Sequence, residues 1–573
     1  MPSKKVLWRS REEVAVEKGL SLPSGELPYL IQKFLRAREV IDSDEIKKMV
    51  SAPIGDLKDP SSIHGLDQAV QRIIKAQEAN EKICIYADFD LDGTSGLALL
   101  YEGLEALGFH NLIYYQPKRL SEGYGFHPHA VEDLSNQGVS LIITVDVGIT
   151  ALEAVQTAKE KNIDVIITDH HQPAETLPVA QVIVNPNLPT DQSGLGYLCG
   201  AGVAFYLLRN LKKKLIELNL AKDGDLDLKK SLEFFTIGTL TDMVPLVGDN
   251  RILVKHGLIY LEKTERPGLR CLLNSLGLTG RPLTSQDVSI RFAPKLNALS
   301  RMEEGILPIH IFLEKDVEQA KLMVTQVLDS NQHRVDHQQS GELEAFEKIK
   351  SWTFDKFIFV SSPQFHKGVL GLIATKVAQQ MNKPTFVGVE VDGVIMGSAR
   401  APNPDWNVLA ALTATSGILN RFGGHYSAAG FELNQKYKES FIQGLHEHFE
   451  VEGSELRPRI VEYDCNLQLH EVTTSLMRWL DVLGPYGQAF PPPLFAMTDL
   501  IVGQVYALKG NHKKLMFFDK DRQNKSEALY FSAPEWIDKT LINQSVRVLV
   551  EPQWNYFSGN LNLQLLIREM VIN

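Results

Sequence analysis

The sequence predicts an α/β protein of two lobes that ends in a C-terminal β-barrel. Between about residues 80 and 190, apolar strand-like runs alternate with helix-like segments, which is typical of a parallel sheet with crossover helices. Residues 314–350 form a charged, helix-prone stretch without proline, which predicts a helix that connects the two lobes. From about residue 456, short strand-like runs separated by turns predict a barrel.

Length and composition bound the class of protein. The 573 residues suggest about three to four domains, and 44% hydrophobic with 23% charged residues is typical of globular proteins. We expect no membrane span and no signal peptide, because apolar runs are short and MPSKKVLWRS lacks an apolar region. The four scattered cysteines form no CxxC pair, which fits a reducing cytoplasm. The net charge of -11 counts mildly against nucleic-acid binding, although a local basic groove can lie on an acidic protein.

The changes in texture along the chain predict five segments. Residues 1–50 are polar and helix-prone and form an expected N-terminal cap. The first α/β lobe is expected at 51–313, the connecting helix at 314–350, a smaller α/β domain at 351–455 and the barrel at 456–573. The smaller domain is expected to use the runs FIFVSS, PTFVGVE and VIMGSAR as strands.

Within the first lobe, the alternation is regular enough to place single elements. The expected strands are residues 82–90, 141–148, 163–171 and 181–186, and the expected helices that follow the first two are 92–108 and 149–162. Thr94 or Ser95 is the expected N-cap of the first of these helices.

Acidic residues and histidines recur where these strands end. The recurring residues are Asp88, Asp90 and Asp92 after the first strand, Asp146 after the second, Asp169, His170 and His171 after the third, and Asp242 at the end of an expected helix. Ligands of open α/β sheets bind outside the carboxyl ends of the strands, so we expect these groups to converge. If the first strand continued through them, its three aspartates would also share one face.

Such a cluster of carboxylates predicts bound cations. Carboxylates in one crevice repel one another unless cations neutralise them, and an oxygen-rich site with one or two histidines suits Mn²⁺ or Mg²⁺. Two ions roughly 3.5–4 Å apart would suit phosphoester hydrolysis. A single aspartate after a strand is more often a helix cap, and a histidine pair is more often structural. Asp92 alone could cap, but that would leave Asp88 and Asp90 unexplained.

The ordered motifs ADFDLDG, TVDVGI, ITDHH and TLTDMVPL resemble the DHH phosphoesterase superfamily. The further runs PKRLSEGYGFHPHA, CGAGVAF, LNALSRM, KGVLGLIATKVA, MGSAR and GGHYSAAGF make the chain similar to the RecJ family of bacterial single-strand exonucleases. The matching motifs cover about residues 55–435. The resemblance implies a DHH catalytic lobe, a DHH-associated domain and an oligonucleotide-binding (OB)-like barrel. It also implies a 5′→3′ exonuclease that degrades single-stranded DNA with two Mn²⁺ or Mg²⁺ ions and acts in repair and recombination.

The resemblance also implies roles for individual residues. The implied metal ligands are Asp88, Asp90, Asp92, Asp146, His170 and Asp242, with His171 at the scissile phosphate or its metal shell. The implied substrate-binding residues are Arg119, Asn297, Arg301, His366 with Gly368, and a pocket for the 5′ end made of Ser398, Arg400, Gly423, Gly424 and His425. The chain departs from the family pattern at Lys295 and Ser300, where Arg and Gly are usual.

The predicted barrel carries basic and aromatic residues that suit single-strand binding. They are Lys509, His512, Lys513, Lys514, Phe517, Phe518, Tyr530, Phe531, Trp554, Tyr556 and Phe557. Stacking of bases on aromatic side chains contributes roughly 1–3 kcal/mol per base. The alternative for each aromatic residue is a place in the barrel core.

Two other functions compete with the exonuclease. A related enzyme could act on short oligonucleotides or cyclic dinucleotides, and a degenerate relative could be a non-catalytic scaffold for a replicative helicase. A pure single-strand-binding module would leave the aspartates unexplained. The exonuclease interpretation implies single-stranded DNA, a single-strand-binding protein and a helicase as partners, no membrane, a cytoplasmic location and a monomer.

Overall fold

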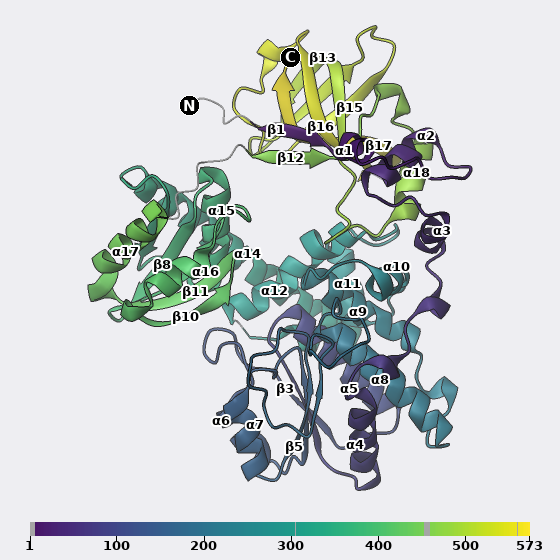
Figure 1. Cartoon of the computed structure of the whole chain (residues 1–573), viewed down its shortest axis with the longest axis vertical. Coiled ribbons are helices and arrows are strands. Elements are labelled where there is room, and N and C mark those ends of the chain that lie inside the picture. Colours follow the sequence, from purple (N-terminus) through teal and green to yellow (C-terminus); the bar gives the residue numbers. More distant parts are fainter. Residues whose placement is uncertain (1–5, 304, 452–458, 558–559) are drawn as a thin grey trace. The chain divides into compact units, whose positions relative to one another are not determined.

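The computed structural model describes the whole chain except residues 1–5, 304, 452–458 and 558–559. The chain divides into two compact units, which are described separately (Figure 1). Unit 1 contains Met1–Leu57, Pro245–Lys255 and Arg457–Asn573, and unit 2 contains Lys58–Val244 and His256–Leu456. Within the described residues, no helix is long and apolar enough to cross a membrane.

Unit 2 begins with a five-stranded sheet whose neighbouring strands are all parallel, which confirms the predicted sheet. In spatial order the strands are β3 (Leu112–Tyr115), β2 (Ile83–Ala87), β4 (Leu141–Val145), β5 (Asp164–Thr168) and β6 (Val182–Val184). Every residue of β2 and β4 is buried, as expected for strands covered on both faces. The edge strand β3 was not predicted.

Helices cover both faces of this sheet (Figure 1). The helices α6 (Pro128–Asn136) and α7 (Leu152–Glu160) share a core with one face of the sheet. Cys84 of β2, Ile142 of β4 and Val165 of β5 contribute to this core. The other helices near the sheet are α4 (Leu66–Glu78), α5 (Leu91–Ala106), α8 (Gly200–Glu217) and α9 (Leu228–Thr241). Unit 2 also contains α11 (Pro267–Ser275), α12 (Ala293–Met302) and α13 (Pro308–Leu313).

The start of α5 differs from the prediction. The strand β2 ends at Ala87, so the expected strand over 82–90 is too long and its three aspartates do not share a strand face. The N-cap is Asp90, whose carboxylate accepts hydrogen bonds from the backbone N–H groups of Asp92 and Gly93. The prediction of Thr94 or Ser95 as the cap was wrong, because Asp90 lies directly before the first free amides of the helix and leaves those two residues inside it.

The helix predicted between the lobes is present as α14 (Val317–Ile349), and a second sheet follows it. In spatial order its strands are β10 (Leu419–His425), β11 (Ala428–Asn434), β9 (Val394–Arg400), β8 (Thr385–Val391) and β7 (Ile358–Ser362). Only β7 and β8 run parallel. The helices α14 and α15 (Leu370–Met381) share a core with one face, and α16 (Val408–Ala414) and α17 (Lys438–Val451) share a core with the other.

Unit 1 contains the predicted barrel, and the barrel is closed. Its strands in spatial order are β13 (Phe495–Ala507), β14 (Lys513–Phe518), β15 (Lys525–Tyr530), β17 (Asn560–Ile572) and β16 (Ser545–Phe557). The first helices of the chain share its core: Phe34 in α2 (Tyr29–Ala37) and Met49 in α3 (Ser43–Ser51) belong to the same buried cluster as Phe495. The segment predicted as a cap over 1–50 therefore packs with the barrel.

Backbone pairing also joins two segments of unit 1 that lie far apart in the sequence. The strand β1 (Leu7–Ser10) pairs in parallel with β12 (Ile460–Tyr463), so the segment predicted as helical begins with a strand. It is followed by α1 (Arg11–Glu17), and unit 1 also contains α18 (Thr474–Leu483) and the beginning of α10 (Gly248–Glu262).

A buried ion pair links these segments. The side chain of Asp464 is 0% exposed and that of Arg38 is 4% exposed. Arg38 Nε and Nη2 donate to the two oxygens of Asp464 at 3.0 and 2.9 Å. Arg38 also donates to the carbonyl of Pro491 and stacks against Phe34 and Phe490. The Arg38 guanidinium group, directly after α2, therefore connects this helix to the chain at Asp464 and at Pro491.

Arg38→Met should lower the free energy of unfolding of unit 1 by about 3–5 kcal/mol, because it leaves the buried Asp464 carboxylate without its bidentate partner. Urea unfolding followed by tryptophan fluorescence would measure the change. The double variant Arg38→Met/Asp464→Leu should recover part of the loss, since no charge is then left buried. A loss below about 1 kcal/mol would contradict the proposed role of the pair.

Candidate metal centre

The residues predicted to bind metal come together beyond the carboxyl ends of β2, β4 and β5. They form three groups within which the candidate ligand atoms lie within 4.8 Å of one another. The groups are Asp146 with His170 and His171, Asp92 with His170 and Asp242, and Asp88 with Asp90 and Asp146. Because His170 and Asp146 each belong to two groups, the three groups form one continuous cluster.

Asp92 is held by the N-terminus of another helix. It lies in the first turn of α5, and only 1% of the residue is exposed to solvent. Its two carboxylate oxygens accept from the backbone N–H groups of Gly200 and Ala201, at 2.6 and 2.9 Å, at the start of α8. The positive end of the helix dipole favours the charged carboxylate there. A Cβ at Gly238 would lie 2.6 Å from Asp92 Oδ1, so a small residue is needed beside it.

Asp146 lies directly after β4 in a strained backbone conformation. Its φ is +62°, in the left-handed region that few residues other than glycine, asparagine and aspartate adopt. Its Oδ1 lies 3.0 Å from His170 Nε2. A Cβ at Gly200 would approach the Asp146 Cβ to 2.3 Å, which explains the glycine at this position of the CGAGVAF run. The sharp turn brings Asp146 close to His170.

Atoms without hydrogen-bond partners mark the centre of the cluster. Among the described residues, none hydrogen-bonds to Asp88 Oδ1, Asp146 Oδ1 or His170 Nε2, although all three atoms are buried. A buried polar atom without a partner costs about 1–3 kcal/mol, and more for a charged group. Carboxylate oxygens and an imidazole nitrogen are the donors that Mn²⁺ and Mg²⁺ accept. The donor set therefore fits one or more divalent cations.

The electrostatics of the aspartates also fit a cation site. Burial and the neighbouring carboxylates raise the pKa of Asp92 to about 8 and the pKa of Asp242 to about 6. The same causes raise the pKa values of Asp88 and Asp146 well above their usual range. The cluster therefore holds its full negative charge at neutral pH only when positive charge is added.

The two histidines of the ITDHH motif differ in charge. Burial and the neighbouring His171 lower the pKa of His170 to about 4, so His170 is neutral and its Nε2 can be a ligand. Burial alone would lower the pKa of His171, but its hydrogen bond and charge interaction with Asp169 raise it to about 9. His171 is therefore protonated at neutral pH and can donate to an anion.

Asp169, which received no role from the sequence, orients this motif. It is fully buried and accepts from the backbone N–H groups of Ile149, His170 and His171. Its Oδ1 also lies 2.8 Å from His171 Nδ1. Asp169 belongs to none of the three candidate ligand groups. Its carboxylate fixes the loop after β5 and the ring of His171. Residues that do not bind a metal themselves but orient the ligands act in this way.

Two residues hold the loop between β2 and α5 in a way that was not predicted. Gln116 follows β3, and its Nε2 donates to the backbone carbonyl of Asp88 at 2.6 Å and to Thr94 Oγ1 at 2.7 Å. Thr94 Oγ1 in turn donates to the carbonyl of Asp90 at 2.6 Å. One side-chain amide therefore fixes the backbone of both aspartates. Gln116 does not stand out in the sequence, because polar side chains in a loop are ordinary, and Thr94 stood out only as a candidate helix cap.

Gln116→Met should weaken divalent-cation binding by about 10–100-fold, because residues that orient metal ligands carry effects of that size. The midpoint of the Mn²⁺-induced rise in melting temperature measures the affinity. Gln77→Met is the matched control, since Gln77 also donates to a backbone carbonyl in unit 2, that of Leu107 at 3.1 Å. Equal Mn²⁺ midpoints in the two variants would show that Gln116 does not position the aspartates.

Arginines form a second cluster in unit 2. The pKa of Arg301 falls to about 9, because of its burial and then the charges of Arg119, Arg334 and Arg400. Burial lowers the pKa of Arg119, while Asp90 and Asp88 act in the opposite direction, so Arg119 interacts with both clusters. Arg334 of α14 was not predicted. Like-charged arginines held together suit an anion such as a phosphate.

The residues predicted to bind a 5′ end share one face of the second sheet. Ser398 and Gly423 both pair with Gly430, and Arg400 and His425 both pair with Ala428. Cross-strand partners lie on the same face, so the four positions form a block on β9 and β10. A Cβ at Gly371 of α15 would lie 2.6 Å from Arg400 Nη2 and 3.7 Å from Ser398 Oγ, so this helix is close to both side chains.

The remaining predicted residues lie near these clusters. Arg301 Nη1 donates to the carbonyl of Gly368, and the N–H of Gly368 donates to His366 Nδ1. Asn297 lies on α12 with Arg301. Gly424 has a φ of +140°, and a Cβ there would lie 2.6 Å from the carbonyl oxygen of Ala428. This position therefore requires glycine.

The aromatic residues of the barrel divide between core and surface. Phe517 and Tyr530 are buried in the core, while Phe531 and Tyr556 are exposed, and Trp554 donates to Asp481. The Phe557 side chain lies outside the described residues. The barrel core thus accounts for two of the residues considered for base stacking and leaves Phe531 and Tyr556 accessible.

Comparison with known proteins gives the family. Three family models match in order: the DHH family N-terminal domain at residues 82–239, the DHHA1 domain at 355–450 and the RecJ OB domain at 463–569. The single-stranded-DNA-specific exonuclease RecJ of Dickeya dadantii is 30% identical, over 95% of this chain and 96% of its own length. The chain belongs to the RecJ family.

Solved RecJ structures agree with this assignment. RecJ from Thermus thermophilus, in complex with Mn²⁺, matches with a TM-score of 0.79 and 26% identity over 100% of this chain and 80% of that one. Another exonuclease RecJ, bound to manganese, is 31% identical and covers 69% of this chain and 98% of its own, with a TM-score of 0.58. The expected RecJ architecture of DHH lobe, DHH-associated domain and OB barrel is confirmed.

Proposed function

We propose that this RecJ-family chain is a 5′→3′ exonuclease that degrades single-stranded DNA to mononucleotides in repair and recombination. The observation that carries the proposal is the cluster of aspartates and histidines around buried atoms without partners, next to an arginine cluster. The relatives from Dickeya dadantii and Escherichia coli are named single-stranded-DNA-specific exonucleases.

The cation-binding residues are proposed to be Asp88, Asp90, Asp92, Asp146, His170 and Asp242. When bound, two Mn²⁺ or Mg²⁺ ions supply an activated water and neutralise charge on the phosphate under attack. The oxygen of that water bonds to phosphorus, the bond from phosphorus to the 3′ oxygen breaks, and this oxygen takes up a proton. No side chain of the chain becomes covalently attached to the substrate.

His171 is proposed to contact the scissile phosphate. Its hydrogen bond with Asp169 raises its pKa, which favours the protonated ring, and the protonated ring can donate a hydrogen bond to a phosphate oxygen. Asp169 keeps the ring in position through Nδ1, which leaves Nε2 directed elsewhere. The protonated ring adds positive charge where negative charge develops in the transition state.

The direction of cleavage is proposed to follow from the second cluster. Arg119, Arg301 and Arg400 present an anion site that also interacts with Asp88 and Asp90 through Arg119. A terminal 5′ phosphate bound there, against Ser398 and the block on β9 and β10, would place the next phosphodiester at the cations. A 3′ end carries no terminal phosphate to occupy the site.

Digestion of single-stranded DNA labelled at either end, with Mn²⁺ or Mg²⁺, tests the proposal. We expect early release of labelled mononucleotide from the 5′-labelled strand, lost in Asp90→Asn, which preserves the helix cap because Asn caps as well as Asp. Early release from the 3′-labelled strand would contradict the direction. Equal digestion of a blunt duplex would contradict the specificity for single strands.

The competing functions are separated by substrate length. Cleavage of dinucleotides without cleavage of long strands would favour the short-substrate enzymes, and inertness on both would favour a scaffold. Truncation of the barrel is a poor test, because the N-terminal helices share its core. A single-strand-binding protein and a helicase are the proposed partners, and the enzyme is proposed to act as a monomer in the cytoplasm.

A further inference from the structure

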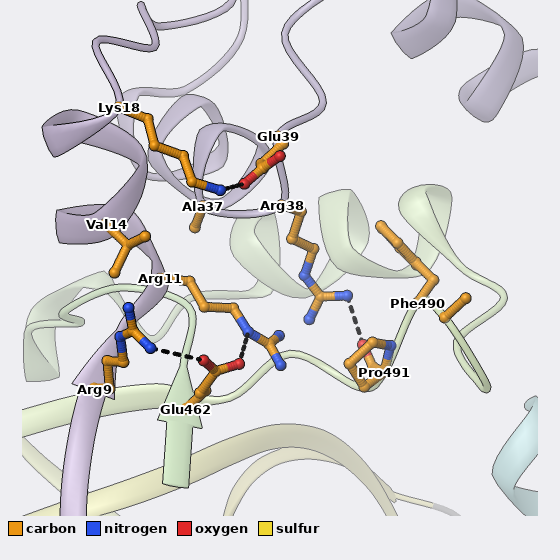
Figure 2. A pocket seen from close by; sticks show the side chains of 11 residues that line it. Arg9, Arg11, Val14, Lys18, Ala37, Arg38, Glu39, Glu462, Phe490 and Pro491 are labelled. Carbon is orange, nitrogen blue, oxygen red and sulfur yellow. Dashed lines mark hydrogen bonds and ion pairs between the residues drawn. The ribbon is translucent and has the colours of Figure 1, made fainter. Parts of the chain in front are cut away.

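A basic pocket lies in unit 1, and none of the residues assigned above to the metal centre or the arginine cluster lines it. It has a volume of about 460 Å³, within the range of ligand-binding pockets. Four cationic side chains line it, one from β1, one from α1 and two from the residues directly after α1 and α2 (Figure 2). They are Arg9, Arg11, Lys18 and Arg38. The chain has a net charge of -11, so a group of four cations from separate elements is a local exception to its overall negative charge.

Arg38 forms the structural side of this pocket. Its donors are used by Asp464 and by the carbonyls of Pro491 and Pro492, and its plane packs on Phe490. The group is almost completely buried. It therefore adds positive charge behind the wall of the pocket, while its own hydrogen bonds stay within the protein.

Arg9 and Arg11 are held more loosely. Within the described part of the chain, Arg9 has one ion pair, to Glu462 at 4.0 Å, beyond hydrogen-bond distance. Arg11 donates to Glu462 and to Asp464 at 3.4 Å each, longer than the usual 2.7–3.2 Å. The Arg9 side chain is 57% exposed and that of Arg11 is 30% exposed. Their guanidinium groups thus have donors available to a ligand.

The charge of the pocket favours an anion. Two carboxylates line it, Glu39 paired with Lys18 and Glu462 paired with Arg9 and Arg11, and Asp464 adds a third beside Arg38 and Arg11. Against four cations this leaves one positive charge uncompensated. The phosphate groups of a strand and of a mononucleotide are both anions, and their oxygens suit the two-pronged donors of arginine.

We propose that this pocket binds a phosphate group through Arg9 and Arg11. The phosphate belongs either to a single strand of DNA or to a free mononucleotide, which are the substrate and the product of the proposed exonuclease, so the inference rests on the proposed function. If the pocket binds a strand, it is a second binding site for the substrate. If it binds a mononucleotide, the product can regulate the activity of the enzyme.

The test measures binding by the full chain without hydrolysis. A fluorescein-labelled (dT)20 strand is titrated in EDTA at several salt concentrations with the parent and with Arg9→Gln/Arg11→Gln. The matched control is Lys47→Gln/Lys48→Gln. Like the arginine variant, it removes two cations of unit 1 that form ion pairs with carboxylates, here those of two aspartates. Free thymidine monophosphate is tested by its effect on melting temperature in an Arg400→Gln background, which weakens the proposed 5′-end site.

If the pocket binds the strand, the arginine variant should bind about 5–30-fold more weakly. The slope of log K against log salt should become shallower by about 0.7 for each phosphate that the variant no longer neutralises. If the pocket binds the mononucleotide, strand binding is unchanged and thymidine monophosphate no longer raises the melting temperature. The control variant should behave as the parent in both assays.

Unchanged strand binding together with an unchanged response to mononucleotide would overturn the inference. Release of mononucleotides by the parent, assayed in parallel with Mn²⁺, tests the proposed function separately. If the parent does not bind strands, the mononucleotide assay alone decides the pocket. Arg9→Lys/Arg11→Lys, which keeps the charges but not the forks, should fall between the parent and the glutamine variant, and it replaces that variant if the latter unfolds.

Discussion

Asp146→Asn is expected to reduce exonuclease activity by at least about 10³-fold and to raise the melting temperature of the metal-free protein. Activity should fall because Asp146 belongs to two of the three candidate ligand groups, and a neutral amide cannot replace its carboxylate there. Bound cations lower the activation barrier by several kcal/mol, and about 1.4 kcal/mol of that barrier corresponds to each tenfold change in rate. The gain follows because one buried charge among like charges is removed.

Asparagine suits this position. It is among the few residues that adopt a φ near +60°, so the backbone after β4 should stay intact. Initial rates on labelled single strands and melting curves in EDTA measure the two effects. Asp133→Asn, at an exposed position of α6, is the control and should change neither. A metal-free melting temperature that falls in Asp146→Asn would show that the carboxylate is a structural partner instead.

Chelation is expected to destabilise unit 2, and to do so more at pH 8 than at pH 6. The pKa values of Asp92 and Asp242 are raised to about 8 and about 6, above an unfolded value of about 3.9. A raised carboxyl pKa stabilises the fold in its protonated form, fully below the unfolded pKa, and this contribution is lost as pH rises through the folded pKa. The metal-free protein therefore becomes less stable between about pH 4 and pH 8.

Cations reverse that trend because they bind the deprotonated carboxylates. At a concentration of Mg²⁺ a hundred times its Kd, the stabilisation is about 2.7 kcal/mol. Melting temperatures with Mg²⁺ and with EDTA, from about pH 5.5 to 8.5, give the difference directly. We expect the difference to grow with pH and to shrink in Asp242→Asn. A difference that does not vary with pH would mean that these carboxylates do not titrate in the metal-free fold.

Much of the fold could be predicted because its signals are local. Buried parallel strands appear as continuous apolar runs, and barrel strands appear as short runs between turns. The edge strand β3 escaped prediction because each of its four residues is only partly buried, so it lacks the burial on both faces that marks the central strands. The cap at Asp90 was missed because an Asp-x-Asp pattern fits a strand end and a helix start equally well, and only the path of the backbone decides between them.

The candidate site was predictable where residues belong to motifs and unpredictable where they act through space. The aspartates and histidines lie at strand ends, and a parallel sheet must bring those ends together. Gln116 and Arg334 come from a loop and from the long helix α14. Nothing in their sequence neighbourhood shows which carbonyl or charge they face. Their roles depend on tertiary distances that no local pattern encodes.

The shared core of unit 1 has a consequence for the order in which the protein is made. The helices α2 and α3 leave the ribosome before unit 2, but their apolar partners in the barrel follow roughly 400 residues later. At about 5–20 residues per second, that interval lasts on the order of 20–80 s. The sequence of unit 2 is made during this interval, while Phe34 and Met49 have no barrel core to enter. The nascent chain therefore carries the unpaired apolar faces of α2 and α3 until the barrel is made.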